Sequence, residues 1–103
     1  MKKHKVSAWS NGKNVFGINL INGLRDKLFD KKWTFIELSI ENKTSFKINL
    51  SDSFWKNCNE LRDSKIKDWF EEINVINWKS RKNPKFYLTK VEENKFLLER
   101  IIN

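Results

Sequence analysis

The sequence predicts an α+β domain in which three antiparallel β-hairpins form a curled sheet or a small open barrel. Alternating apolar residues recur in pairs of short runs that turn residues separate. Apolar residues at helical spacing occupy three short stretches, which predicts one short helix and a pair of helices packed on the sheet. Because the chain has 103 residues, we expect a single domain covering residues 1–103.

The first predicted hairpin covers residues 5–9 and 14–20. An Asn-Gly pair lies between the two runs, and this pair favours the positive φ angles of a tight turn. Asn22 is expected to cap a short helix in which Leu24 and Leu28 lie one turn apart.

The clearest strand signal covers residues 33–41 and 44–50. Apolar and polar residues alternate in both runs, which predicts two strands that pair across a short polar turn. Six side chains are therefore expected to point into one core: Ile36, Leu38, Ile40, Phe46, Ile48 and Leu50.

Two consecutive helices are predicted next, over residues 52–61 and 64–73. Ser51 or Asp52 can cap the first helix, and Ser64 can cap the second. Their apolar residues fall at helical spacing and are expected to pack on the sheet: Phe54, Cys58, Leu61, Ile66, Trp69, Phe70 and Ile73. The acidic residues of the second helix are expected to face water: Asp68, Glu71 and Glu72.

The last predicted hairpin starts at Phe86, turns at residues 92–94 and continues to Ile101. Before it, residues 79–85 contain four cations, no acid and one proline, Pro84, which blocks a helix. This segment is expected to be a solvent-facing loop.

The net charge is +8, and the positive charge is unevenly distributed. Residues 51–73 contain six acids and four bases, so the rest of the chain has ten more bases than acids. No acid precedes Asp26. Positive charge distributed in this way creates an electrostatic field that attracts polyanions. Cations that neutralise phosphates release the counterions of the polyanion, and this release drives binding. Nucleic acid is therefore the expected partner, with DNA slightly favoured over RNA.

The predicted interface combines cations that hold phosphates with aromatic rings on which bases stack. The cations are Lys3, Lys5, Lys13, Lys79, Arg81, Lys82 and Lys85. The aromatic residues beside them are Trp9, Trp78 and Tyr87. The sequence leaves open whether Trp78 and Tyr87 are exposed or belong to the core.

The sequence does not predict an enzyme of a familiar motif class. His4 is the only histidine and lies in an N-terminal tail that is expected to be mobile. One histidine and one cysteine, Cys58, cannot supply a zinc site, and the three glycines form no phosphate-binding loop. We therefore expect no cofactor and no metal. A metal-free ribonuclease that uses Arg81, Lys85 and Tyr87 is a minor alternative.

Other functions remain open on the sequence alone. One alternative is that the basic surface serves solubility alone. A small inhibitor or adaptor that binds a protein, for example one from a mobile element, would use the same basic patch. A helix-turn-helix is disfavoured because its second helix would present acids to DNA. The single cysteine and the lack of a long apolar run predict a cytoplasmic chain without a membrane span.

Overall fold

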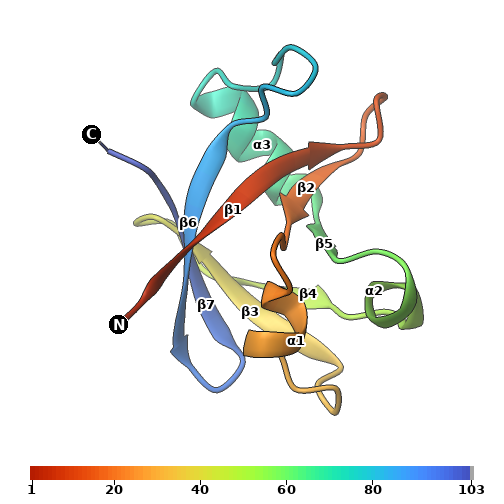
Figure 1. Ribbon diagram of the computed structural model, residues 1–103. Helices are drawn as coiled ribbons and strands as arrows, with labels where there is room; N and C mark the ends of the chain where they lie inside the picture. Colours follow the sequence, from red (N-terminus) through yellow and green to blue (C-terminus); the bar gives the residue numbers. More distant parts are fainter. Residues whose placement is uncertain (103) are drawn as a thin grey trace.

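Seven strands form one curved, nearly closed barrel-like sheet in the computed structural model, which describes residues 1–102 (Figure 1). The strands are β1 (Lys3–Ser10), β2 (Phe16–Asn19), β3 (Phe35–Ile40), β4 (Phe46–Asn49), β5 (Glu60–Arg62), β6 (Lys85–Glu92) and β7 (Lys95–Arg100). The helices are α1 (Leu24–Leu28), α2 (Asp52–Lys56) and α3 (Ser64–Glu72). The predicted α+β class and the barrel-like sheet are confirmed. None of these helices is long and apolar enough to cross a membrane.

The strand order across the sheet is β4-β3-β7-β6-β1-β2-β5. Antiparallel pairing joins β1 to β2, β3 to β4 and β6 to β7, and β1 also pairs antiparallel with β6. The β3–β7 pair is parallel, with Leu38 opposite Phe96. This pair was not predicted, because a parallel pair joins strands that are far apart in the chain and leaves no local turn signal.

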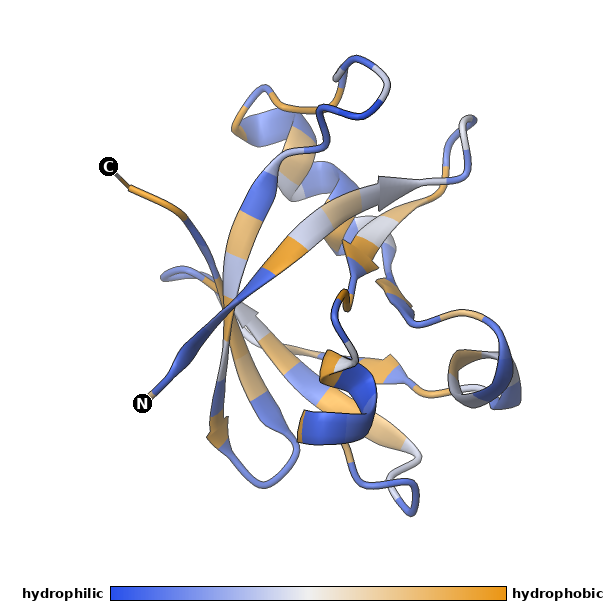
Figure 2. Cartoon of the chain, viewed as in Figure 1, coloured by the Kyte–Doolittle hydropathy of each residue, from blue (hydrophilic) through white to orange (hydrophobic). Residues whose placement is uncertain are grey.

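The core lies on the inner face of the sheet, where apolar residues alternate with polar ones along the strands (Figure 2). The expected core face of the second hairpin is confirmed: Ile36, Leu38, Ile40 and Ile48 are buried, and Phe46 and Leu50 are partly buried against them. α3 buries Ile66, Trp69 and Phe70. Its acidic side chains are exposed, as expected: Asp68, Glu71 and Glu72.

The predicted helix over residues 52–61 is wrong in its second half. α2 ends at Lys56, and Glu60–Arg62 forms strand β5 at one edge of the sheet. Leu61 is buried from this strand, where it pairs with Ile18 of β2. A three-residue strand is too short to show an alternating pattern, so helical spacing was the stronger signal. Because β5 separates α2 from α3, the two helices do not form a helix-turn-helix.

Two of the predicted helix caps also differ. Gly23 occupies the N-cap position of α1, and the expected cap Asn22 has a φ angle of 58°. Ser51 caps α2 as expected, but Asp63 replaces Ser64 as the cap of α3. The Asp63 carboxylate accepts a hydrogen bond from the main-chain N–H two residues ahead, which satisfies a free donor of the first turn.

His4 does not lie in a mobile tail. β1 begins at Lys3, and His4 pairs with Leu88 of β6. Burial lowers the pKa of the His4 imidazole, and the nearby charges of Lys2 and Lys27 lower it further. The N-terminal segment is therefore part of the sheet, because β6 supplies hydrogen-bond partners that local sequence cannot reveal.

Candidate nucleic-acid interface

The pairing of β1 with β6 brings together two segments without acids. Residues 1–25 and 73–91 contain ten cations and no acidic residue. The first segment includes β1 and β2, and the second includes β6 as far as Val91. Since β6, β1 and β2 are neighbours in the sheet, the two segments form one continuous basic region.

Strand alternation decides which of these side chains face outward. Val6 and Ala8 of β1 and Phe86 and Leu88 of β6 are buried in the core. The residues between them lie on the outer face, where Lys5 is opposite Tyr87. Lys3 and Lys85 share this face, so the sheet brings together four of the predicted interface residues.

The cations of the region differ in their partners. Lys3 lies 3.4 Å from the Glu99 carboxylate and 5.6 Å from the ring centre of Tyr87. Within residues 1–102, six other predicted cations have no carboxylate oxygen within 4.0 Å. We call these six residues the basic face: Lys5, Lys13, Lys79, Arg81, Lys82 and Lys85. Lys3 is a weaker candidate for phosphate binding, because Glu99 already neutralises its charge.

The loop before β6 is attached to β1 at its base. The Ala8 N–H donates a hydrogen bond of 2.8 Å to the carbonyl oxygen of Pro84. The Asn83 side-chain amide donates another of 2.8 Å to the carbonyl oxygen of Ala8. Lys85 lies next to these contacts, and its ammonium donates to the Asn83 carbonyl at 3.1 Å. The predicted non-helical loop is confirmed, with its C-terminal end held against the sheet.

The exposed tip of this loop is a tight turn. The Lys82 N–H donates to the carbonyl oxygen of Lys79 at 3.0 Å, and Arg81 has a φ angle of 66°. That conformation favours glycine, and it costs a residue with a side chain about 1 kcal/mol. The turn directs three exposed cations, Lys79, Arg81 and Lys82, to solvent within four residues.

The β1–β2 connection is wider than the expected Asn-Gly turn. Ser10 pairs with Phe16, so five residues form the loop. The Asn11 side-chain oxygen accepts hydrogen bonds from the main-chain N–H groups of Lys13 (2.9 Å) and Val15 (3.1 Å). These bonds order the loop internally, which holds Lys13 at an exposed position next to the sheet.

A groove separates this loop from the segment that follows α3. We call it the tryptophan groove; its volume is about 470 Å³, and its lining includes Trp9, Lys13, Ile76, Asn77, Trp78 and Lys79. Four of these residues belong to the predicted interface: Trp9, Lys13, Trp78 and Lys79. Ile76 and Asn77 were not among the predicted residues, because no local pattern in the sequence indicates that residues 76–79 approach the β1–β2 loop.

Both tryptophan rings of the groove are held by neighbouring side chains. Trp78 is half-buried, and its ring packs edge-to-face on Phe16 (5.9 Å between ring centres) and Phe70 (6.1 Å). Trp9 is also half-buried, and the Arg62 guanidinium lies 4.6 Å from its ring centre. Trp78 is therefore neither fully exposed nor fully buried: its ring packs against the core and also lines the groove.

The Arg62–Trp9 contact depends on Gly17. Trp9 pairs with Gly17, and Gly17 pairs with Arg62, so the ring and the guanidinium come from strands on either side of β2. A Cβ atom at Gly17 would overlap the carbonyl oxygen of Leu61. Glu60 bonds the Arg62 guanidinium at 2.9 Å, which raises the pKa of Arg62. Arg62 was missed because the sequence analysis placed the preceding residues in a helix.

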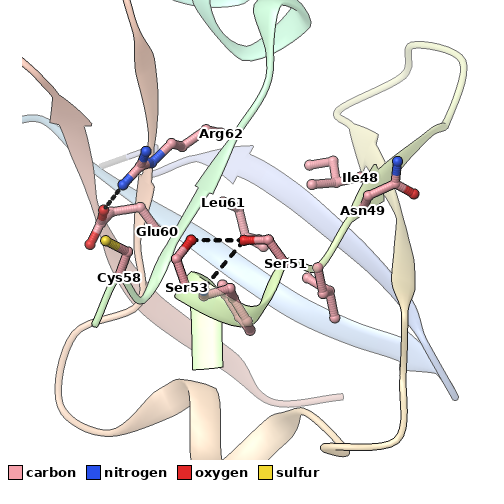
Figure 3. Close-up of a pocket in the computed structure, with 10 residues that line it drawn as sticks. Ile48, Asn49, Ser51, Ser53, Cys58, Glu60, Leu61 and Arg62 are labelled. Atoms are coloured by element: carbon pink, nitrogen blue, oxygen red, sulfur yellow. Dashed lines mark hydrogen bonds and ion pairs between the residues drawn. The ribbon is translucent and has the colours of Figure 1, made fainter. Parts of the chain in front are cut away.

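A second, smaller pocket lies at the opening of the barrel between β4 and β5 (Figure 3). Its volume is about 90 Å³, and four of its polar side chains are bonded in pairs: Ser51 to Ser53 at 2.9 Å, and Arg62 to Glu60. Cys58 also lines it, half-buried in the connection before β5 and not in a helix as predicted. In residues 1–102, no group of three His, Cys, Asp or Glu side chains is placed to hold a metal ion.

No protein-family model matches the chain, and comparisons with curated proteins and with solved structures found no match either.

Proposed function

We propose that this small barrel-like domain binds nucleic acid through the basic face, and that it acts by binding and not by catalysis. One observation carries the proposal: the β1–β6 pair joins two acid-free segments, and eight of their ten cations, including all six of the basic face, have no carboxylate partner in residues 1–102. Cations that are already paired within a protein gain little from a phosphate. Unpaired cations bind a polyanion and release its counterions.

The arrangement suits a contact along a phosphate backbone. Lys5 and Lys85 lie on the outer face of two neighbouring strands, and Arg81 and Lys82 lie on the exposed turn beyond them. Such cations position a nucleic acid without specifying its sequence. We therefore expect the domain to bind unrelated nucleotide sequences with similar affinity. The slight preference for DNA is tested by comparing its affinity for DNA and RNA of equal length.

The test is a titration with labelled single-stranded and double-stranded oligonucleotides at several salt concentrations. Each phosphate contact should add about 0.9 to the slope of log affinity against log salt on a duplex, or roughly 0.7 on a single strand. Replacing Arg81 and Lys82 together by alanine should weaken binding to every sequence and lower the slope by about one per cation removed. The melting temperature should stay nearly unchanged, because both side chains are exposed.

The matched control replaces Lys43 and Lys95 by alanine, which removes the same charge from two cations that are ion-paired, with Glu72 and Glu37. Oligonucleotide binding by this variant should stay close to that of the parent. If the Arg81/Lys82 variant binds as tightly as the parent with the same salt slope, the loop is not a phosphate clamp. The alternative of an inhibitor or adaptor would then be favoured, and it predicts a stoichiometric complex with one protein and no binding of free oligonucleotides.

A further inference from the structure

We infer that the tryptophan groove takes an unpaired base of a single-stranded nucleic acid, with the flanking phosphates held by Lys13 and Lys79. This inference rests on the proposed function and adds to it a ligand form, a single strand, and a place for one base. Both lysines line the groove, and neither has a carboxylate partner within residues 1–102.

The lining of the tryptophan groove combines aromatic rings with cations. Trp9 and Trp78 line the same groove as Lys13, Lys79 and the exposed residue Asn77. Aromatic rings beside cations are the side chains that proteins use to bind single strands, because each base has a stacking face and each linkage has a charge. The Asn77 amide offers a donor and an acceptor for the edge of a base.

Both tryptophan rings are held by neighbouring side chains before any ligand binds. Trp78 is fixed edge-to-face by Phe16 and Phe70, and Trp9 is held by the Arg62 guanidinium. A ring that is fixed before binding loses little side-chain freedom when a base stacks on it, so more of the stacking energy appears as affinity. The volume of about 470 Å³ also distinguishes this groove from the small, internally bonded pocket between β4 and β5.

The groove is accessible to a flexible strand. It lies between the β1–β2 loop and the segment after α3, and the exposed residues Lys13 and Lys79 are part of its lining. A duplex keeps its bases stacked inside and offers only its phosphates to such a surface, whereas a single strand can turn a base into the groove. A duplex should therefore bind through charge alone, and a single strand should bind through charge and stacking together.

The experiment compares three labelled oligonucleotides of equal length and charge at one low salt concentration. They are a single-stranded oligothymidylate, the same backbone with abasic sites throughout, and the matching oligoribonucleotide with uracil bases. Oligothymidylate should bind about tenfold to a hundredfold more tightly than the abasic strand, as expected for one stacked base. Tighter binding of the ribonucleotide than of the deoxyribonucleotide would identify RNA as the preferred source of the base, and the reverse order would identify DNA.

The variants assign this difference to the groove. Trp9→Ala should remove most of the preference for base-bearing strands while leaving the affinity for the abasic strand unchanged. Asn77→Leu narrows the groove without removing a core side chain, and it should have the same effect in a protein whose melting temperature matches the parent. Trp55→Ala is the matched control, because Trp55 is another half-buried ring under an arginine, Arg25 at 5.9 Å, but lies outside the groove.

The outcomes separate this inference from the proposed function. If the parent binds the abasic strand and oligothymidylate equally well with the same salt slope, the base-binding groove is wrong and phosphate binding by the basic face still holds. An unchanged base preference in both Trp9→Ala and Asn77→Leu would also overturn the inference. If none of the strands binds at low salt, the proposed function fails as well.

Discussion

The two sides of the sheet use positive charge in different ways. Around β3 and β7, three cations are paired: Arg100 with Glu41 at 2.8 Å, Lys43 with Glu72 at 2.9 Å, and Lys95 with Glu37 at 3.7 Å. On the β6-β1-β2 side, the six cations of the basic face have no such partner among residues 1–102. The three paired cations connect elements of the fold, whereas the six cations of the basic face connect none through an ion pair within residues 1–102.

The pair of Arg100 and Glu41 shows what a structural charge does here. The Arg100 guanidinium donates two hydrogen bonds to the Glu41 carboxylate, and the Arg100 main-chain N–H donates a third. These bonds tie the end of β7 to the residue that follows β3. Most exposed ion pairs contribute little to stability, but a two-point contact of this kind is stronger than a single one.

The largest expected effect is at the edge of the sheet, where β5 pairs with β2. Gly17→Ala should lower the free energy of unfolding by about 3 kcal/mol, because the new methyl group overlaps the Leu61 carbonyl and forces β5 away from β2. Loss of the pairing between β2 and β5 should also release the Arg62 guanidinium from the Trp9 ring. Chemical denaturation measures the first effect, and tryptophan fluorescence follows the second. Gly12→Ala is the control: its Cβ meets open space, so only the positive φ angle should cost stability, by about 1 kcal/mol.

Removing a paired charge should have the next largest effect. Glu41→Gln should lower the free energy of unfolding at neutral pH by about 1 kcal/mol and leave oligonucleotide affinity nearly unchanged. The hydrogen bond from Arg100 is the main cause that lowers the pKa of the Glu41 carboxyl. The stabilisation that the ionised Glu41 carboxylate gives the folded state is therefore fully present above the pKa of an unfolded glutamate, about 4.3. It is lost as the pH falls through the lowered pKa of the folded state.

Urea denaturation of parent and Glu41→Gln between about pH 3 and pH 7 checks this prediction, because the difference in stability should shrink only at the acidic end. A difference that stays constant over the whole range would show that the carboxylate charge is not what stabilises the contact. A fall in oligonucleotide affinity without a change in stability would contradict the division between paired and unpaired charges.

A smaller effect of opposite sign is expected on the basic face. Arg81→Gly should raise the free energy of unfolding by about 0.5 kcal/mol. Glycine adopts the positive φ angle without strain, and this gain outweighs the extra conformational freedom of glycine in the unfolded chain. The same change should weaken oligonucleotide binding and lower the salt slope by about one. Thermal denaturation and salt titration of the one variant measure both. Arg81→Ala separates the two effects, since it removes the charge without relieving the backbone.

The smallest effect concerns His4 of β1. Because burial lowers the pKa of its imidazole in the folded chain, the unfolded chain binds a proton more readily. The parent should therefore lose stability as the pH falls from above about 6.5 toward the lowered folded value, and His4→Gln should lack that loss. The two proteins are compared by thermal denaturation at closely spaced pH values. Equal pH profiles would show that His4 does not titrate differently on folding.

Much of the local structure follows from patterns in the sequence. The alternation in residues 33–50 predicted both strands of the second hairpin and their core face, because one buried face imposes a period of two on the sequence. The basic loop before β6 was predicted from its charges and Pro84. The cations at Lys79, Arg81 and Lys82 are exposed as expected, since burial of unpaired charges is costly.

Other features depend on contacts between distant segments. Strand β5, the parallel β3–β7 pair and the strand position of His4 arise because a neighbouring strand supplies backbone partners from far away in the chain. The same holds for the candidate site. The sequence by itself determined that the protein has an α+β fold and carries acid-free basic segments with aromatic neighbours. Only the tertiary structure decided that β1 lies beside β6, that Arg62 reaches Trp9 across Gly17, and that Trp9 and Trp78 line one groove, because non-local strand pairing sets these distances and leaves no pattern in the local sequence.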